Sequence, residues 1–208
     1  MSELLADCVR KIAGLRGGER VLLITPGPHG AEILPALIGA FAAHLLTALE
    51  SSQDRLRQID PRIKRVRGTA TRLPFKKHTF DAVISFEALY SIRPPWTTLA
   101  EFHRVLVPDG GLILCEKSAH GFFSALRDKL TGPGKRVFSI EEIKFRLARA
   151  DFQIESIKNV ERMELLNAPA CVIRAVTIEN PAEPVPQFLT AKEMLERRKN
   201  PPVGEQLP

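Results

Sequence analysis

Two acidic side chains stand where a carboxylate could bind a ligand or move a proton. Glu50 closes the apolar segment 44–50, and Glu87 follows the apolar segment 80–85. A carboxylate accepts hydrogen bonds, so Glu50 could hold two neighbouring hydroxyl groups of a sugar. Alternatively, Glu50 only caps the next helix or faces solvent. The sequence leaves both interpretations open.

A second group of side chains could act as a general base. Glu87 and Tyr90 follow residues 80–85, and His120 lies further along the chain. A base is needed only where the attacking group must lose a proton. No spacing singles out one of the three, so Glu87 and Tyr90 stay candidate catalytic residues. Both could instead simply begin the next helix. The sequence contains no metal-ligand cluster and no nucleophile triad.

Alternating apolar segments predict the elements that must position these residues. The expected strands are residues 21–24, 44–50, 62–67, 80–85, 112–116, 152–160 and 170–178. Amphipathic spacing predicts helices over residues 4–15, 96–106 and 139–147. The apolar segment 31–43 is also expected to be a helix, and a short helix is expected to begin at Ser51 or Ser52. This alternation is typical of an α/β layered sheet with mostly parallel strands. Ligands of such sheets lie beyond the carboxyl ends of the strands.

Three motifs follow one another in the middle of the chain. They read Gly68-Thr-Ala-Thr-Arg-Leu-Pro-Phe75, Phe80-Asp-Ala-Val-Ile84 and Arg104-Val-Leu-Val-Pro-Asp-Gly-Gly111. They resemble the Gly-Asp-Ala-x-x-Leu-Pro-Phe, Phe-Asp-x-Val and Arg-Val-Leu-x-Pro-Gly-Gly segments of class I S-adenosylmethionine-dependent methyltransferases, in the small-molecule, type 11-like branch. The resemblance covers residues 17–178. It implies a Rossmann-like, seven-stranded, mostly parallel sheet with helices on both faces.

The resemblance also implies S-adenosylmethionine as cofactor and a set of residues to bind it. These residues come from the first loop and from the ends of the second, third and fourth strands: Gly27, Gly30, Glu50, Thr69, Ala70 and Ser85. Among them, Glu50 is expected to bind the ribose. Thr69 falls where the family has an acid that accepts a hydrogen bond from the adenine amino group.

The cofactor loop departs from the family's pattern. Leu23 stands where the family has an aspartate that orients the loop, and Thr25 replaces its first glycine. A hydrogen bond to a charged group contributes roughly 1.5–3 kcal/mol, so losing the acids at Leu23 and Thr69 could weaken binding about a hundredfold or far more. The leading hypothesis is methyl transfer to a small-molecule acceptor. The rival is a catalytically inactive, methyltransferase-like scaffold protein that contacts a partner through its C-terminal tail.

The chain length, the number of cysteines and the length of the apolar runs give the remaining expectations. The 208 residues fit one domain over 1–179 and a proline-rich tail over 180–208, with a possible short helix at 188–199. Three widely spaced cysteines favour a reducing, cytoplasmic compartment. No run is long enough to cross a membrane.

The net charge of +6 arises largely from basic clusters at residues 62–77 and 127–136. Such clusters indicate either a surface for nucleic acid or another anion, or a solvated face, and we favour the solvated face. Nucleic acid is not the expected partner, since the chain has one Trp and one Tyr for base stacking. A small-molecule acceptor or a protein partner is expected instead.

Overall fold

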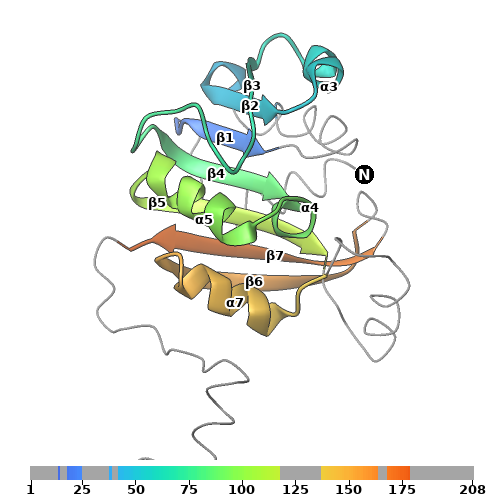
Figure 1. Cartoon of the computed structure of the whole chain (residues 1–208), viewed down its shortest axis with the longest axis vertical. Coiled ribbons are helices and arrows are strands. Elements are labelled where there is room, and N and C mark those ends of the chain that lie inside the picture. The colour runs from blue at the N-terminus through green and yellow to red at the C-terminus, as the bar shows by residue number, and fades with distance from the viewer. Residues whose placement is uncertain are drawn as a thin grey trace, which may run out of the picture.

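A parallel sheet forms the centre of the computed structural model, which describes residues 14, 18–24, 38, 42–117, 137–163 and 168–178 (Figure 1). Its parallel strands are β1 (Val21–Ile24), β2 (Leu46–Glu50), β3 (Lys64–Arg67), β4 (Phe80–Phe86) and β5 (Leu106–Lys117). Strand β1 pairs with both β2 and β4, so the chain order reverses on either side of β1. This reversal is the topological switch point at which ligands of open α/β sheets bind.

Two long strands complete the sheet beyond β5. Strand β7 (Ala168–Thr177) runs antiparallel to β5, and β6 (Phe152–Met163) pairs with β7 at the outer edge. The full order is β3-β2-β1-β4-β5-β7-β6. The predicted seven-stranded, mostly parallel sheet is therefore confirmed, and its last two strands are longer than the sequence pattern indicated.

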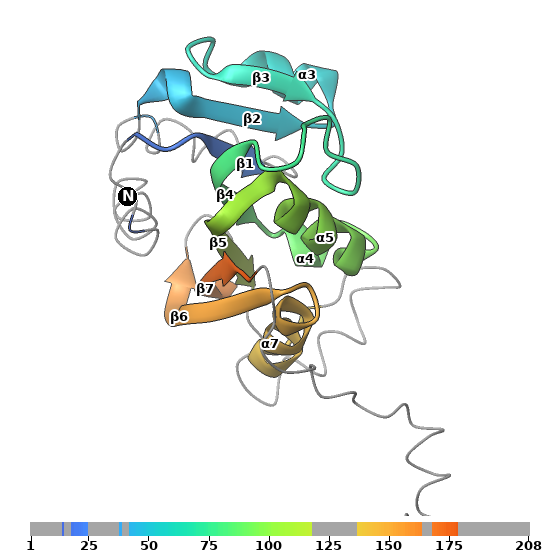
Figure 2. The ribbon, with the colours of Figure 1, turned by 90° about the vertical axis from the view of Figure 1, so that its left-hand side faces the viewer.

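Three helices cover one face of this sheet. They are α4 (Ala88–Ser91), α5 (Pro95–Val105) and α7 (Ile140–Ala148), and Figure 2 shows all three on the same side of the strands. The short helix α3 (Gln53–Gln58) follows β2, and the 3-10 turn η1 (Ala43–Leu45) precedes it. Leu22 and Leu23 point to opposite faces of β1, yet both are fully buried. Such burial on both faces is the rule for parallel strands.

Local sequence sets where the described helices begin. The Ser52 hydroxyl accepts a hydrogen bond from Arg55 N at the start of α3. Helix α7 opens with a capping box, in which Ser139 and Glu142 each bond the other's backbone N–H. These bonds satisfy amide groups that a helix leaves without partners in its first turn.

The Pro108–Gly111 motif forms a bulge inside β5, whereas the sequence predicted that this strand begins only at residue 112. Phe80 pairs with Leu106, but Ala82 pairs with Gly111, so the extra residues bulge out of the ladder. Asp109 takes a positive φ of 57° in this bulge. A Cβ at Gly110 would lie 2.7 Å from Val107 O, so this position requires glycine. The strand therefore begins at Leu106, directly after α5.

An ion pair on α5 ties two of the motifs together. The Glu101 carboxylate binds the Arg104 guanidinium at 2.7 Å and accepts a bond of 2.6 Å from Leu73 N. Arg104 also donates to the carbonyl oxygens of Leu73 and Phe75, at 3.1 and 2.8 Å. The Leu73–Phe75 segment is thus held against α5 through its own backbone. This contact joins Arg104 of the third motif to the backbone of the first motif.

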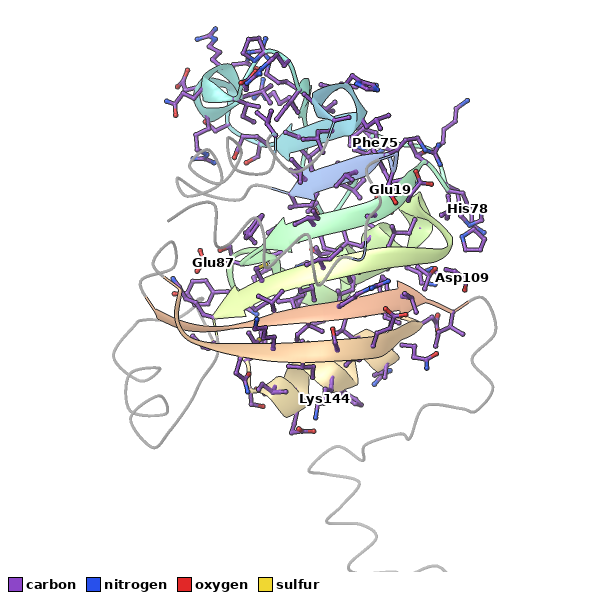
Figure 3. The ribbon with its side chains drawn as sticks, turned by 180° about the vertical axis from the view of Figure 1, so that it is seen from behind. Glu19, Phe75, His78, Glu87, Asp109 and Lys144 are labelled. Carbon is purple, nitrogen blue, oxygen red and sulfur yellow. The ribbon has the colours of Figure 1, made fainter. Side chains whose placement is uncertain are left out.

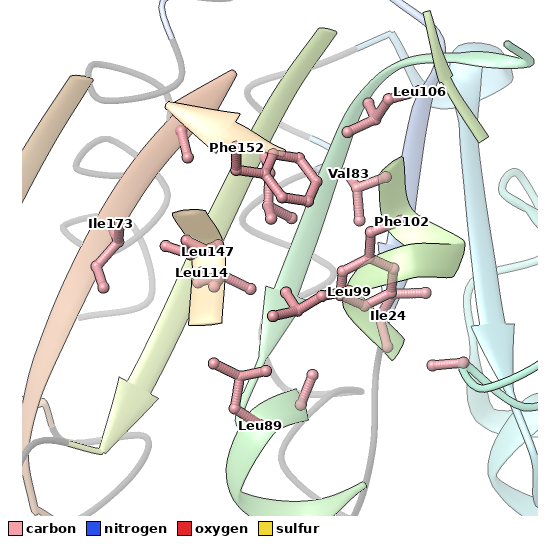
Figure 4. Close-up of a cluster of buried hydrophobic side chains, with 14 of the residues drawn as sticks. Ile24, Val83, Leu89, Leu99, Phe102, Leu106, Leu114, Leu147, Phe152 and Ile173 are labelled. Carbon is pink, nitrogen blue, oxygen red and sulfur yellow. The ribbon is translucent and has the colours of Figure 1, made fainter. Parts of the chain in front are cut away.

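The covered face packs into one apolar core (Figure 4). Leu99 and Phe102 of α5 lie against Ile24 and Val83 of the central strands, and all four side chains are at most 2% exposed. Leu147 of α7 extends the same cluster towards β7. The core fixes α5 over the strands whose carboxyl ends carry the site.

Some predicted elements fall outside the described residues. These are the helices expected over 4–15 and 31–43, the basic cluster at 127–136, and the tail 180–208 with its helix at 188–199. The proposed domain boundary near residue 179 stays a prediction.

Replacement of Phe102 by alanine should lower the free energy of unfolding by about 3–5 kcal/mol, because it removes a fully buried ring and leaves a cavity. Trp96→Ala, on the same helix but 65% exposed, is the matched control and should change stability by less than about 0.5 kcal/mol. Chemical denaturation measures both values. Equal losses for the two variants would contradict the packing of α5 described above.

Candidate functional site

The carboxyl ends of the central strands bring the predicted site residues to one edge of the sheet. Leu49, Ile24 and Ser85 lie in one row across β2, β1 and β4. Neighbouring strands are about 4.8 Å apart, so the ends of β2 and β4 lie about 10 Å from each other. Figure 3 shows Glu87 at this edge, whereas His78 and Asp109 lie at the opposite one. The site is therefore organised around the end of β1.

Glu50 ends β2 with its side chain almost fully buried. Its carboxylate accepts hydrogen bonds from Arg55 Nη2 at 2.8 Å, Ser52 N at 2.9 Å and Ser51 Oγ at 3.2 Å. All three donors bind Oε1, and none of these bonds uses Oε2. Glu50 thus helps to hold the start of α3, which agrees with the alternative that it caps the next helix. Its second oxygen keeps the capacity to accept hydrogen bonds from hydroxyl groups.

The charge state of Glu50 follows from two opposing effects. Burial raises the pKa of its carboxyl, but the hydrogen bonds from Arg55 and Ser52 and the positive charge of Arg55 outweigh burial, so the pKa lies below the usual value. Glu50 is therefore ionised at neutral pH. An ionised acceptor is what binding of a sugar's hydroxyl groups requires.

The chain passes the edge again just after β3. Gly68 N donates to Glu50 O at 3.1 Å, and a Cβ at Gly68 would lie 2.9 Å from Leu49 Cδ1. Thr69 is exposed, and its hydroxyl bonds that of Thr71 at 3.4 Å. Ala70 is buried in the core and offers only its backbone. The predicted Gly27 and Gly30 lie outside the described residues, as do Thr25 and His120.

Ser85 lies in β4 between Glu50 and the acceptor side of the site. Its side chain is fully buried, and within the described part of the chain its Oγ has no hydrogen-bond partner. A buried hydroxyl without a partner is uncommon and costs free energy. Ser85 was predicted to bind the cofactor, and its Oγ is a polar atom at the strand ends that could accept a hydrogen bond from a ligand or donate one to it.

The other two predicted residues, Glu87 and Tyr90, meet beyond the end of β4. Glu87 is the residue before α4 and adopts a left-handed conformation with φ of 52°, which non-glycine residues rarely take. Its Oε1 lies 2.6 Å from Lys117 Nζ, and this ammonium group also lies 4.9 Å from the centre of the Tyr90 ring. The structure brings the two catalytic candidates together through Lys117, a residue that the sequence analysis missed.

Glu116 is a second residue that the sequence analysis missed. It is 2% exposed, and its two carboxylate oxygens accept hydrogen bonds from Leu89 N at 3.0 Å and Tyr90 N at 3.3 Å. Burial is the largest influence on its acidity and raises its pKa to about 8, and the nearby charge of Glu87 adds to the rise. In the sequence, Glu116 and Lys117 are two charged residues that follow an apolar strand. Hydrophobic periodicity indicates only that the strand ends there, so it did not predict a functional role for either residue.

Known proteins resemble this chain most clearly across its middle. Residues 32–114 match the methyltransferase domain family. A demethylmenaquinone methyltransferase from Clavibacter sepedonicus is 36% identical over 107 residues, which cover 49% of this chain and 42% of that relative. The chain thus spans less than half the length of that relative.

Two solved structures share the whole architecture. A SAM-dependent methyltransferase from Methanosarcina mazei has a TM-score of 0.66 at 18% identity and covers 80% of this chain and 95% of its own. An S-adenosylmethionine-dependent methyltransferase from Mesorhizobium loti has a TM-score of 0.63 at 17% identity and covers 85% and 98%. This chain has the class I methyltransferase fold, and residues 32–114 match the methyltransferase domain family. Family and fold together imply S-adenosylmethionine as the cofactor.

Leu23 departs from the pattern of the methyltransferases that this chain resembles. The side chain is fully buried in β1 between Ala48 and Ile84, its partners on the two neighbouring strands. It packs as core, and it offers no polar atom to the cofactor. The retained acceptors for a nucleoside are Glu50 Oε2 and Ser85 Oγ, so the residues present fit the sugar end of S-adenosylmethionine.

Within the described ranges, no three or more His, Cys, Asp and Glu side chains group in a way that could hold a metal ion. None of the helices described there is long and apolar enough to cross a membrane.

Glu116 predicts a pH dependence of stability that does not depend on any ligand. Its usual pKa is 4.5, and in the folded chain it is about 8. Between these values the folded chain holds a proton that the unfolded chain has lost, so the free energy of unfolding falls as pH rises through this window. The fall should reach several kcal/mol, since one pKa unit corresponds to about 1.4 kcal/mol.

The variant Glu116→Gln should flatten this fall, because glutamine does not titrate. Glu141→Gln, at an exposed position of α7, is the control and should keep the slope of the parent chain. Denaturation at a series of pH values measures all three. A slope that survives in Glu116→Gln would assign the titration to another group.

Proposed function

We propose that this chain transfers a methyl group from S-adenosylmethionine to a small-molecule acceptor. The single observation that carries the proposal is Glu50, an ionised carboxylate at the end of β2 with one oxygen left to accept hydrogen bonds. The bonds that hold the start of α3 use Oε1 alone, so that structural role leaves Oε2 for a ligand's hydroxyl groups. The motifs and the fold support the same reaction class.

In this proposal, the part of the site that binds the cofactor makes few charged contacts with it. Glu50 Oε2 would accept hydrogen bonds from the ribose hydroxyls, and the backbone around Thr69 and Ala70 would lie beside the adenine. Ser85 Oγ would gain the partner that it lacks within the described residues. When bound, S-adenosylmethionine supplies a methyl group that is already activated, so positioning and exclusion of water provide much of the rate.

The acceptor side is the cluster beyond β4 and β5. We assign proton removal from the acceptor to Glu87, whose carboxylate is held by Lys117 and whose backbone is fixed in the turn before α4. Tyr90 remains the alternative, since Lys117 lies over its ring. Glu116 holds this turn through Leu89 N and Tyr90 N. The Clavibacter relative favours an acceptor of the demethylmenaquinone kind.

The alternative is a methyltransferase-like binding protein without catalysis. Leu23 favours this alternative, because it is buried as core where the family has a charged residue. Partner contacts would then involve the proline-rich tail, residues 180–208. Binding of the cofactor separates the two functions.

We also propose that the protein works in the cytoplasm. Cys115 and Cys171 are buried thiols, as is usual in a reducing compartment.

S-adenosylmethionine and S-adenosylhomocysteine should raise the thermal midpoint of unfolding of the intact chain. A ligand at one hundred times its dissociation constant adds about 2.7 kcal/mol of stability. The variant Glu50→Gln should weaken this binding about tenfold or more, because it removes the charge from the ribose acceptor. Calorimetric titration measures the dissociation constants.

Asp60→Asn is the matched control for Glu50→Gln. It removes one carboxylate charge from an exposed pair with Arg62 and should leave cofactor affinity unchanged. Unchanged affinity in Glu50→Gln would refute the ribose contact. No stabilisation of the parent chain by millimolar cofactor would favour the scaffold function.

Glu87→Gln should lower kcat for a demethylmenaquinone-type acceptor at least tenfold and leave cofactor affinity unchanged, because general-base catalysis contributes roughly a hundredfold or more. Tyr90→Phe, measured beside it, tests the other candidate. Production of S-adenosylhomocysteine reports the rate. An unaltered kcat in Glu87→Gln together with a loss in Tyr90→Phe would transfer the role to Tyr90.

A further inference from the structure

The positive charge of this chain is concentrated in one short stretch. Residues 55–78 carry nine Lys and Arg side chains against one acid, Asp60, which gives a net charge of +8. The whole chain has a net charge of +6, so all remaining residues together carry −2. A distribution this uneven creates a local positive field, and general solubility does not account for it.

Six of these cations have no acid within ion-pair distance among the described residues, and we call them the basic edge: Lys64, Arg65, Arg67, Arg72, Lys76 and Lys77. All six are exposed. The other three are already neutralised, since Arg55 pairs with Glu50, Arg57 with Asp54 and Arg62 with Asp60. The basic edge is therefore exposed and has no ion-pair partner in that part of the chain.

The basic edge covers the outer strand and continues onto the face that carries α5. Lys64, Arg65 and Arg67 lie on β3, the last strand on that side of the sheet. The loop after β3 crosses towards α5 (Figure 1), where Glu101 and Arg104 hold its backbone at Leu73. Arg72 lies close enough to Glu101 to lower the pKa of that carboxyl, after larger effects from Arg104 and Leu73 N.

Trp96 adds an apolar group to the same face. It is the large hydrophobic side chain most exposed in the described part of the chain, at 65%, and the only Trp in the sequence. It lies in the first turn of α5, five residues before Glu101 and thus about 7.5 Å from it along the helix axis. An exposed Trp on a face that also carries Lys and Arg side chains is a combination that binds the interface of an anionic bilayer.

We propose that the basic edge and Trp96 form a docking surface for an anionic lipid membrane. Phosphate headgroups would pair with the six cations, and the Trp96 ring would enter the headgroup region. Each such cation increases partition to an anionic surface about fivefold. The proposal does not depend on methyl transfer, and its test uses no cofactor.

Nucleic acid fits this surface less well. Proteins that read single-stranded RNA on a sheet stack bases on an open sheet face. Here both faces of the central strands are buried, as Leu22 and Leu23 show. The charges lie on an edge strand and a loop, and the aromatic ring among them, Phe75, is partly buried against Phe80.

The test is binding of the full chain to vesicles made of equal parts phosphatidylglycerol and phosphatidylcholine, with pure phosphatidylcholine vesicles as the neutral comparison. Because Trp96 is the only Trp, its emission reports on this one position. We expect co-sedimentation and a blue shift of Trp96 emission with the anionic vesicles alone. High salt should release the chain, since it screens exposed charges.

A charge-matched pair of variants locates the surface. Lys64→Glu/Arg65→Glu should weaken vesicle binding tenfold or more. Arg149→Glu/Lys158→Glu changes the net charge equally at exposed positions near β6, the opposite edge of the sheet, and should bind like the parent chain. Circular dichroism verifies that both variants fold.

Four outcomes would overturn the proposal. They are absence of binding, equal binding to neutral vesicles, equal loss in the two double variants, and sedimentation without a shift of Trp96 emission. Polyuridylate that displaces the chain from anionic vesicles at a lower phosphate concentration than the lipid would identify the surface as a nucleic-acid site instead.

Discussion

Parallel pairing of β1 with both β2 and β4 is the constraint on which the rest of the site depends. It places Leu49, Ile24 and Ser85 in one row, so the chain leaves three neighbouring strands at the same edge. Glu50 and Glu87 follow that row and lie at this edge although 36 residues separate them in the sequence. A register shift of one residue would turn every side chain of a strand to its other face. The close packing of the side chains on both faces of β1 and β4 opposes such a shift.

The acceptor side shows how folding accommodates charge at this edge. Glu116 loses its hydration almost completely, and the backbone N–H groups of Leu89 and Tyr90 replace part of it. Glu87 is compensated differently, by the ammonium group of Lys117. Glu116 in β5 and Glu87 just after β4 thus have different surroundings. The raised pKa of Glu116 follows a pattern seen at functional sites, although Glu116 also has the structural role of holding α4.

The basic edge has a structural role as well. A strand at the border of a sheet exposes unpaired backbone groups, and charged side chains discourage another chain from pairing with them. Lys64 and Arg65 serve this purpose on β3. That role requires charges on the strand, but it does not account for Arg72, Lys76 and Lys77 on the loop beyond it. Protection of the strand and docking to a membrane are therefore compatible uses of the same cations.

The sequence contained enough information for most elements and for one side of the site. The segments 21–24 and 80–85 became β1 and β4 almost without change, since strands buried on both faces must be apolar throughout. The spacing of Ser139 and Glu142 predicted the start of α7, because a capping box is a local interaction. The position of Glu50 at the carboxyl edge followed from the same local pattern.

Contacts between distant residues could be decided only by the tertiary structure. Whether Pro108–Gly111 forms a turn or a bulge depends on the pairing of β5 with β4, and the residues themselves suit both. Lys117 meets Glu87, and Glu116 meets the start of α4, because β4 and β5 are neighbours in the sheet. Local periodicity determined the strands, the helices and the acid at the end of β2. The order and register of the strands, set by burial over the whole domain, decided which charges face each other.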